Sequence, residues 1–165
     1  MVLIKECCYA IKKLKEFLDS HGIKYVSTGH SPAYTAQEIA AAANIPRKCL
    51  AKTVVVKIAD KLAMAVLPAD CRVDFGLLKD VTGEDKIELA SEREFEDSFP
   101  DCDVGAMSPF GNLYGLEVYA AGSLAKNEEI VFNAGTHSEI IRLAYKDFAN
   151  LAKPKVANFS YFASV

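Results

Sequence analysis

Two neighbouring apolar runs constrain the fold of this chain more than any other feature of its sequence. The runs are Leu50–Ile58 and Leu62–Pro68, and the segment between them, Ala59–Lys61, has the composition of a β-hairpin connection. The second run is apolar at consecutive positions, so a strand formed by it needs cover on both faces. The pattern therefore predicts a hairpin whose second strand lies at the centre of a sheet.

Helical signals surround the predicted hairpin. Apolar side chains recur at helical spacing through the first segment, which predicts an amphipathic helix that ends near Gly22. Residues able to cap a helix precede three further segments, at Thr35, Asp74 and Ser91. A last helical stripe is expected before Pro154, and it consists of Ile140, Ile141, Ala144, Phe148 and Leu151.

Short strands complete the pattern. We expect them at residues 23–27, 87–90, 116–120 and 130–134, whereas the turn-rich segment 105–112 is expected to be irregular. Strands that are joined in hairpins and interrupted by helices indicate the α+β class with a mostly antiparallel sheet.

The size and composition of the chain indicate one folded domain, residues 1–165. The chain has 165 residues, of which 51% are hydrophobic, enough to bury a core without disulfides or metals. No apolar run has the length of a membrane span and the first residues are unlike a signal peptide, so we expect a cytoplasmic protein without membrane contact. Five cysteines without a C-x-x-C pair and three scattered histidines predict reduced thiols, no metal site and no cofactor.

The charge distribution narrows the class of partner. The formal net charge is −3, which argues against a protein that coats DNA or RNA. Residues 84–103 hold nine acidic and two basic side chains, so the rest of the chain is net positive. A basic face that binds an anion is therefore permitted, provided that the acidic segment lies elsewhere.

Lys52 carries the most chemical information of any single residue. In an extended strand it shares one face with four aliphatic side chains, whereas Lys57 belongs to the other face. An ammonium deep in that face needs an anion or carbonyl groups to receive it, because its desolvation costs several kcal/mol. Alternatively, Lys52 lies at the end of the strand and extends into water.

Two glycine-containing segments are candidates for a ligand site. Residues 105–111 contain two glycines and a proline, which suits a loop that presents backbone groups to a ligand and equally a bend between strands. Residues 133–138 are expected to lead into a helix, whose dipole would favour a neutral, substrate-positioning His137; otherwise His137 is merely near the cap. His30, in a loop, is a weaker candidate. A cysteine hydrolase is disfavoured, because no cysteine lies in a glycine-flanked turn.

Five segments together carry a family resemblance, and they are residues 30–38, 50–54, 65–69, 105–111 and 133–137. In this order they resemble the YbaK family of free-standing aminoacyl-tRNA deacylases, which is related to the editing domain inserted in bacterial prolyl-tRNA synthetases. The resemblance covers residues 20–154 and leaves an N-terminal helix, 1–19, and a C-terminal tail, 155–165, outside it. It implies a curved, mostly antiparallel (mixed) sheet or barrel surrounded by helices, with an acyl pocket at one side.

The resemblance also implies a site. Lys52 stands where the family has its essential lysine, and Gly105 opens a G-x-x-x-P loop whose backbone is expected to orient water or substrate, so both are catalytic candidates. Substrate contacts are expected from His30, Ser108, Pro109, Gly111, Gly135, Thr136 and His137. Two residues depart from the family pattern: Ala106 replaces a second glycine of many members, and Thr53 replaces the asparagine of the alanine-editing branch.

The activity implied by the resemblance is hydrolysis of the ester that joins a wrongly attached amino acid to the 3′ acceptor end of tRNA. Catalysis would rest on transition-state stabilisation and the ribose hydroxyl rather than on a side-chain base. We expect aminoacyl-tRNA and an aminoacyl-tRNA synthetase as partners, and no DNA. Two alternatives stay open: a non-catalytic module that binds the acceptor end or a synthetase, and a hydrolase of another small ester or amide.

Overall fold

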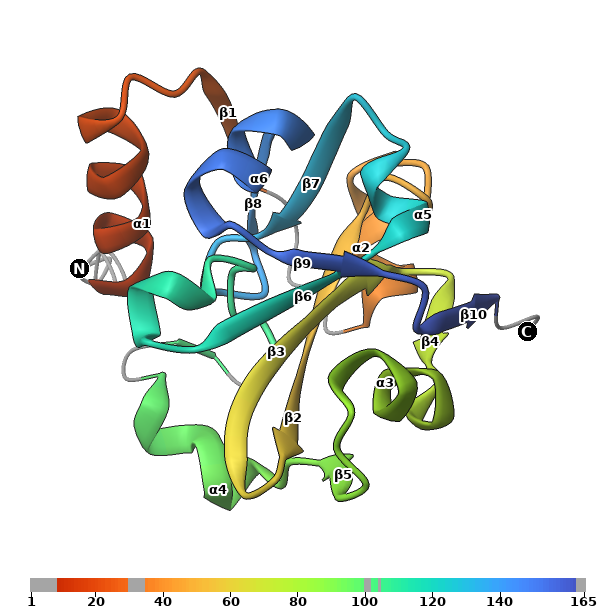
Figure 1. Cartoon of the computed structure of the whole chain (residues 1–165). Helices are drawn as coiled ribbons and strands as arrows, with labels where there is room; N and C mark the ends of the chain where they lie inside the picture. The colour runs from red at the N-terminus through yellow and green to blue at the C-terminus, as the bar shows by residue number, and fades with distance from the viewer. Residues whose placement is uncertain (1–8, 30–34, 100–101, 104, 163–165) are drawn as a thin grey trace.

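The computed structural model describes residues 9–29, 35–99, 102–103 and 105–162 (Figure 1). None of the helices in these residues is long and apolar enough to cross a membrane. In chain order the elements are α1 (Tyr9–Ser20), β1 (Tyr25–Gly29), α2 (Ala36–Ala42), β2 (Ala51–Ile58), β3 (Lys61–Pro68), β4 (Cys71–Val73), α3 (Phe75–Thr82), β5 (Ile87–Leu89), α4 (Glu92–Phe95), the 3₁₀ helices η1 (Glu96–Ser98) and η2 (Gly111–Tyr114), β6 (Glu117–Ala121), α5 (Gly122–Ala125), β7 (Glu129–Asn133), β8 (Glu139–Ala144), α6 (Tyr145–Ala152), β9 (Lys155–Ala157) and β10 (Ser160–Phe162).

The predicted hairpin forms the middle of the largest sheet. β2 and β3 pair antiparallel along their whole length, and Lys61 already pairs with Ile58. The turn therefore has two residues instead of the three expected, Ala59 and Asp60, whose φ angles of 50° and 69° suit a tight hairpin. The strand order β5-β2-β3-β6-β9 places β3 at the centre, as predicted, and residues 63–68 of this strand are buried.

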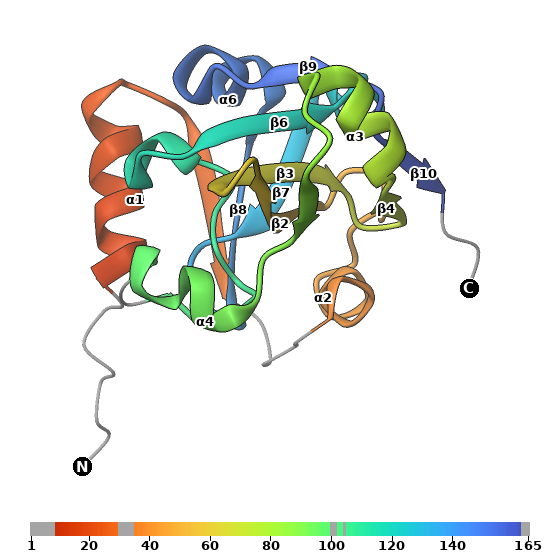
Figure 2. The same cartoon turned by 60° about the horizontal axis from the view of Figure 1, so that its bottom comes forward.

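The large sheet is mixed, because β6 runs parallel to β3 and β9 runs parallel to β6. A three-stranded antiparallel sheet, β1-β8-β7, and a two-stranded antiparallel ribbon, β10-β4, complete the β-structure of the described residues. Helices α1, α3, α4 and α6 lie around the outside of these strands (Figure 2). The predicted α+β class with a mixed, mostly antiparallel sheet is confirmed.

The predicted capping residues begin helices. Thr35 precedes α2, and its Oγ1 accepts the Glu38 N–H at 3.1 Å. Asp74 precedes α3, and its Oδ1 accepts the Leu77 N–H at 3.0 Å. Ser91 precedes α4 as part of a capping box. These short polar side chains satisfy backbone donors that have no partner inside the helix, so each helix begins where the sequence pattern indicates.

The expected helical stripe from Ile140 to Leu151 is wrong in its first half. Residues 139–144 form β8, the middle strand between β1 and β7, and α6 begins only at Tyr145. Ile140 and Ile141 belong to different hydrophobic clusters, so both faces of β8 are covered. A strand buried on both faces is apolar at consecutive positions, and over a few residues this pattern cannot be told from a helical stripe.

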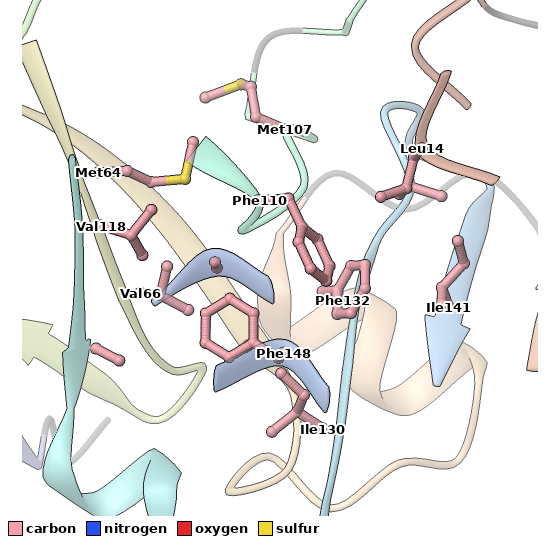
Figure 3. Close-up of a cluster of buried hydrophobic side chains, with 14 of the residues drawn as sticks. Leu14, Met64, Val66, Met107, Phe110, Val118, Ile130, Phe132, Ile141 and Phe148 are labelled. Atoms are coloured by element: carbon pink, nitrogen blue, oxygen red, sulfur yellow. The ribbon is translucent and has the colours of Figure 1, made fainter. Parts of the chain in front are cut away.

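Two hydrophobic clusters cover opposite faces of the large sheet. The larger cluster contains five buried phenylalanines, and Figure 3 shows three of them: the centroid of Phe110 lies 5.7 Å from that of Phe132 and 5.5 Å from that of Phe148. The second cluster contains Leu67 of β3, residues of α3, and Phe159 between β9 and β10. The C-terminal segment is therefore built into the fold through both strand pairing and the core.

Gly111 begins η2 as a buried residue and lies next to Val118 and Met64 of the larger cluster. A Cβ atom there would lie 2.7 Å from Cγ2 of Val118 and 3.1 Å from the carbonyl oxygen of Leu116. The core therefore leaves no room for a side chain at this position, which gives the glycine a packing reason. That Gly111 also contacts substrate stays a prediction.

Replacing Gly111 by alanine is expected to lower the free energy of unfolding by about 1–3 kcal/mol, the usual cost of overpacking a core. Urea denaturation measures this change. Gly122→Ala is the matched control, because a Cβ atom there would lie 3.9 Å from its nearest neighbour, the Ala157 carbonyl oxygen. We expect the control to change stability by less than about 0.5 kcal/mol. Equal stabilities of the two variants would contradict the packing role.

Candidate functional site

β2 and β7 meet at one point and then diverge. The contact is a parallel bridge between Leu50 and Val131, in which the Val131 N–H donates to the Cys49 carbonyl oxygen at 2.9 Å. Further along this edge of β2, the Val55 carbonyl oxygen accepts the Ala90 N–H at 3.1 Å, and pairing with β5 follows. The edge between these two contacts borders a cleft.

Backbone groups as well as side chains face this cleft. In a strand, the N–H and C=O groups point alternately to one side and the other. The Cys49 and Val55 carbonyls both bond on this edge. Thr53 lies four residues after Cys49 and two before Val55, so it directs its own N–H and C=O toward the same side. The open edge of β2 is therefore a source of backbone hydrogen bonds for a ligand.

The cleft has a volume of about 160 Å³ and collects residues that lie far apart in the sequence. Its lining comes from α2, β2, the turn that contains Gly105 and the end of β7, and it consists of Ile39, Leu50, Ala51, Lys52, Thr53, Gly105 and Asn133. The two residues expected to be catalytic, Lys52 and Gly105, thus lie in one cavity. The volume suits a small chemical group rather than a whole nucleotide.

Lys52 is partly buried, on the face of β2 that also carries Val54 and Val56. Strand alternation predicts this sharing of a face with aliphatic residues. Burial lowers the pKa of the Lys52 ammonium, and the nearby Arg72 guanidinium lowers it as well, whereas Cys71 and Asp70 act in the opposite direction. The ammonium is therefore partly desolvated and lies within a group of interacting charges.

The contrast with Lys57 shows what is particular about Lys52. Lys57, on the opposite face of the same strand, forms salt bridges with Glu94 at 2.6 Å and Glu88 at 3.3 Å. Among the residues that the structure describes, Lys52 forms no salt bridge within 4.0 Å. A partly buried cation without a close carboxylate can pair with a negatively charged group of a ligand.

Two polar side-chain atoms of the cleft lining are buried without a hydrogen-bond partner in the described part of the chain. They are Oγ1 of Thr53 and Oδ1 of Asn133. Leaving such an atom unsatisfied costs about 1–3 kcal/mol, so native structures contain few of them. Both residues line one small cleft together with Lys52, which makes this cleft the candidate site of the chain.

Two glycine-bearing turns stand next to each other at the cleft. The Asp103 N–H donates to the Gly135 carbonyl oxygen at 2.9 Å, and the Gly135 N–H donates to the Ala106 carbonyl oxygen at 2.9 Å. Gly105 and Gly135 have φ angles of 83° and 104°, in the region that favours glycine. The paired hydrogen bonds hold the Gly105 turn against the connection between β7 and β8.

His137 lies beside Gly105, but not at the start of a helix. Residues 134–138 connect two antiparallel strands, β7 and β8, and the next helix begins at Tyr145. The predicted effect of a helix dipole on the imidazole is therefore wrong, because no helix begins at this point. The ring is still near the cleft: a Cβ atom on Gly105 would lie 3.7 Å from Cε1 of His137.

The remaining predicted contact residues occupy different places. Ser108 and Pro109 are buried in the segment that follows Gly105, with Ser108 only 4% exposed. Thr136 is partly buried in the connection that contains His137. His30 lies outside the described residues.

Sequence reasoning did not select Thr53 or Asn133 as contact residues. Each stands as a polar residue next to apolar neighbours in a strand, which is the signal that could have identified them. Thr53 and Asn133 come to line the same cleft because of the way β2 and β7 diverge, and local sequence patterns do not report the distance between two strands.

Comparisons with known proteins agree with this architecture. A family model, the aminoacyl-tRNA editing domain, matches residues 30–151. The multifunctional Ser/Thr-tRNA deacylase ProXp-y of Escherichia coli K12 is 32% identical over 114 residues, which cover 66% of this chain and 68% of that protein. The proline–tRNA ligase of Bacillus cytotoxicus is 34% identical over 90 residues, which cover 54% of this chain and 16% of the ligase. The chain thus corresponds to a small part of that synthetase.

Solved structures show the same fold. A protein described as a candidate trans-editing enzyme for prolyl-tRNA synthetase has a TM-score of 0.78 and 21% identity, over 92% of this chain and 97% of its own. The hypothetical protein APE2540 has a TM-score of 0.81 and 19% identity, over 90% of this chain and 99% of its own. Together with the family model, which spans well over half of its residues, these matches show that the chain belongs to the aminoacyl-tRNA editing domain family.

Proposed function

We propose that this protein is a trans-editing hydrolase that cleaves the ester bond of mischarged aminoacyl-tRNA. The observation that carries the proposal is the composition of the cleft: Lys52, Thr53 and Asn133 line one small cavity beside the Gly105 turn, and the last two each have a buried polar atom without a partner in the described part of the chain. Family membership and the deacylase named among its relatives support it. We place the reaction in the cytoplasm, where aminoacyl-tRNA is used.

The reaction adds water to the ester carbonyl and breaks the bond between the carbonyl carbon and the ribose oxygen. The products are the free amino acid and tRNA with its terminal hydroxyl restored. Negative charge develops on the carbonyl oxygen in the transition state, and fixed donors stabilise it more than they stabilise the ester. The Lys52 ammonium and the backbone N–H of Thr53 are two donors that we assign to this role.

The lining argues against covalent catalysis. Among the described residues that line the cleft, none is a cysteine, histidine, aspartate or glutamate. Lys52, with its charge retained, is suited to electrostatic stabilisation of the carbonyl oxygen or of the terminal phosphate rather than to nucleophilic attack. We infer that the attacking water is activated by the substrate's own ribose hydroxyl, with the Gly105 turn orienting water or substrate.

The polar atoms of Thr53 and Asn133 favour a small amino acid that carries a hydroxyl group. The α-ammonium, which every aminoacyl group carries, could satisfy one of these atoms, and a side-chain hydroxyl could satisfy the other, which a methyl side chain would leave without a donor. A site built to bond a hydroxyl discriminates strongly against the analogue that lacks it. We therefore propose seryl groups and similar small hydroxylated acyl groups as substrates. We also propose prolyl-tRNA synthetase as the associated synthetase, because a proline–tRNA ligase contains a segment that matches this chain.

The experiment that tests the function is a panel of aminoacyl-tRNAs treated with catalytic amounts of the purified protein. Release of at least one amino acid is expected, whereas binding without release would support the non-catalytic module.

Lys52→Ala is expected to reduce the rate about 100-fold or more, the usual effect of removing one transition-state donor. Lys57→Ala, from the opposite face of β2, is the matched control and should retain activity. Unchanged turnover in Lys52→Ala would remove Lys52 from the mechanism.

Thr53→Val tests the proposed acyl specificity, because it removes the hydroxyl and keeps the shape. The value of kcat/KM for seryl-tRNA is expected to fall about tenfold, the equivalent of one hydrogen bond, and that for alanyl-tRNA should change little. Single-turnover assays with both substrates measure the two values. An equal fall for both would show that the Thr53 hydroxyl does not read the acyl group.

The charges around Lys52 predict how its pKa responds to substitution. In the wild-type protein the pKa of Lys52 is expected below its ordinary value of 10.5, mainly because of burial. Asp70→Asn should lower it further, because a carboxylate that favours the ammonium is lost. Arg72→Ala should raise it, because a neighbouring positive charge is removed. NMR titration of the lysine side chain measures both shifts, and shifts of the opposite sign would contradict this arrangement of charges.

A further inference from the structure

The backbone of Asp103 joins the two glycine-bearing turns of the cleft. Its N–H donates to the Gly135 carbonyl oxygen at 2.9 Å, and its own carbonyl oxygen accepts the Ala106 N–H at 3.0 Å. The second of these bonds closes a turn around Gly105, which lines the cleft and has a φ angle of 83°. Asp103 therefore anchors the Gly105 turn to the connection between β7 and β8.

The Asp103 side chain bonds to the same connection two residues further along. Its Oδ2 accepts the His137 N–H at 3.4 Å. The His137 ring in turn lies next to the cleft lining, because a Cβ atom on Gly105 would be 3.7 Å from Cε1 of the imidazole. The carboxylate therefore holds the backbone of the residue whose ring stands beside the Gly105 turn.

The charge of Asp103 is unfavourable for a protein that binds tRNA. Asp103 is exposed, and it is the last carboxylate of the acidic segment 84–103. It lies two residues from Gly105, at the cleft to which we assign a substrate rich in phosphate. A carboxylate repels phosphate groups. Its hydrogen bond to a backbone N–H, rather than its charge, thus gives a reason for a carboxylate at this position.

We propose that Asp103 is a positioning residue, whose carboxylate holds His137 and thereby keeps the Gly105 turn in the position that ester hydrolysis needs. The proposal rests on the proposed function, in which this turn orients water or substrate. Asp103 acts through the turn and does not itself contact the reacting atoms. Reacting groups have to be held to within about 0.5 Å, so a small displacement of the turn slows the reaction even where the fold is retained.

Steady-state deacylation tests this role, with the aminoacyl-tRNA that the panel identifies as substrate. Asp103→Ala removes the hydrogen-bond acceptor and is expected to lower kcat about tenfold with little change in KM. Asp103→Asn keeps an acceptor oxygen and should retain kcat. It should not raise KM, because it removes a charge that repels phosphate. Both variants are expected to fold, since Asp103 is exposed.

Asp74→Ala is the matched control, because it also removes a carboxylate that accepts a backbone N–H. The Asp74 Oδ1 accepts the Leu77 N–H at 3.0 Å at the start of α3, and Asp74 is not among the residues that line the cleft. This variant should lower the free energy of unfolding, measured by urea denaturation, and leave kcat unchanged. Loss of one such bond therefore affects stability at both places and kcat only at Asp103.

NMR measures the geometry without any substrate. A nuclear Overhauser effect between Hε1 of His137 and the α protons of Gly105 is expected in the wild-type protein and in Asp103→Asn. It should be weakened or lost in Asp103→Ala, because His137 and the turn are then no longer held together by the carboxylate.

Wild-type kcat in Asp103→Ala overturns the proposal, and so does an equal fall of kcat in Asp103→Asn or in Asp74→Ala. An Overhauser effect that depends on Asp103, in a protein that hydrolyses no aminoacyl-tRNA, would refute the proposed function and keep the structural contact. Hydrolysis that is unaffected by Asp103→Ala would support the proposed function and refute the positioning role.

Discussion

The candidate site depends on a difference in backbone hydrogen bonding between the two edges of β2. One edge is bonded to β3 along its whole length, so the strand is rigid. The other edge is bonded at the Leu50–Val131 bridge and again from Val55 onward, and it is open between these points. A rigid strand with an open segment holds Lys52 and Thr53 in place while leaving space for a ligand beside them.

The cleft holds groups that are unfavourable for stability alone. A partly buried ammonium without a close carboxylate and two unsatisfied polar atoms each lower the stability of the folded chain. The large apolar clusters on both faces of the sheet supply the stability that tolerates these groups. Lys57, on the same strand, shows the usual arrangement of a lysine, in which two carboxylates pair with the ammonium. Such departures from the ordinary pairing of a lysine are expected at functional sites.

The C-terminal strands link the outer part of the chain to this site. β9 extends the large sheet at β6, Phe159 is buried in the second cluster, and β10 pairs with β4 close to the charges around Lys52. These residues follow the segment that the family model matches.

Local patterns predicted the features that depend on near neighbours in the chain. The β2–β3 hairpin, the central position of β3, the capping residues and the face occupied by Lys52 follow from periods of two or 3.6 residues and from side chains that bond their own turn. The same reasoning failed for residues 139–144, because a strand covered on both faces is apolar at every position and resembles a helical stripe.

The sequence by itself thus determined the central hairpin, the capped helix starts and the side chain that lies on the apolar face of one strand. Only the tertiary structure decided that Thr53 and Asn133 line one cleft, that Gly105 lies against His137, and that no helix dipole acts on that imidazole. The reason is physical. The period of apolar residues depends on contacts within one helix or one strand, whereas the width of a cleft depends on how the packing of the whole core separates two strands.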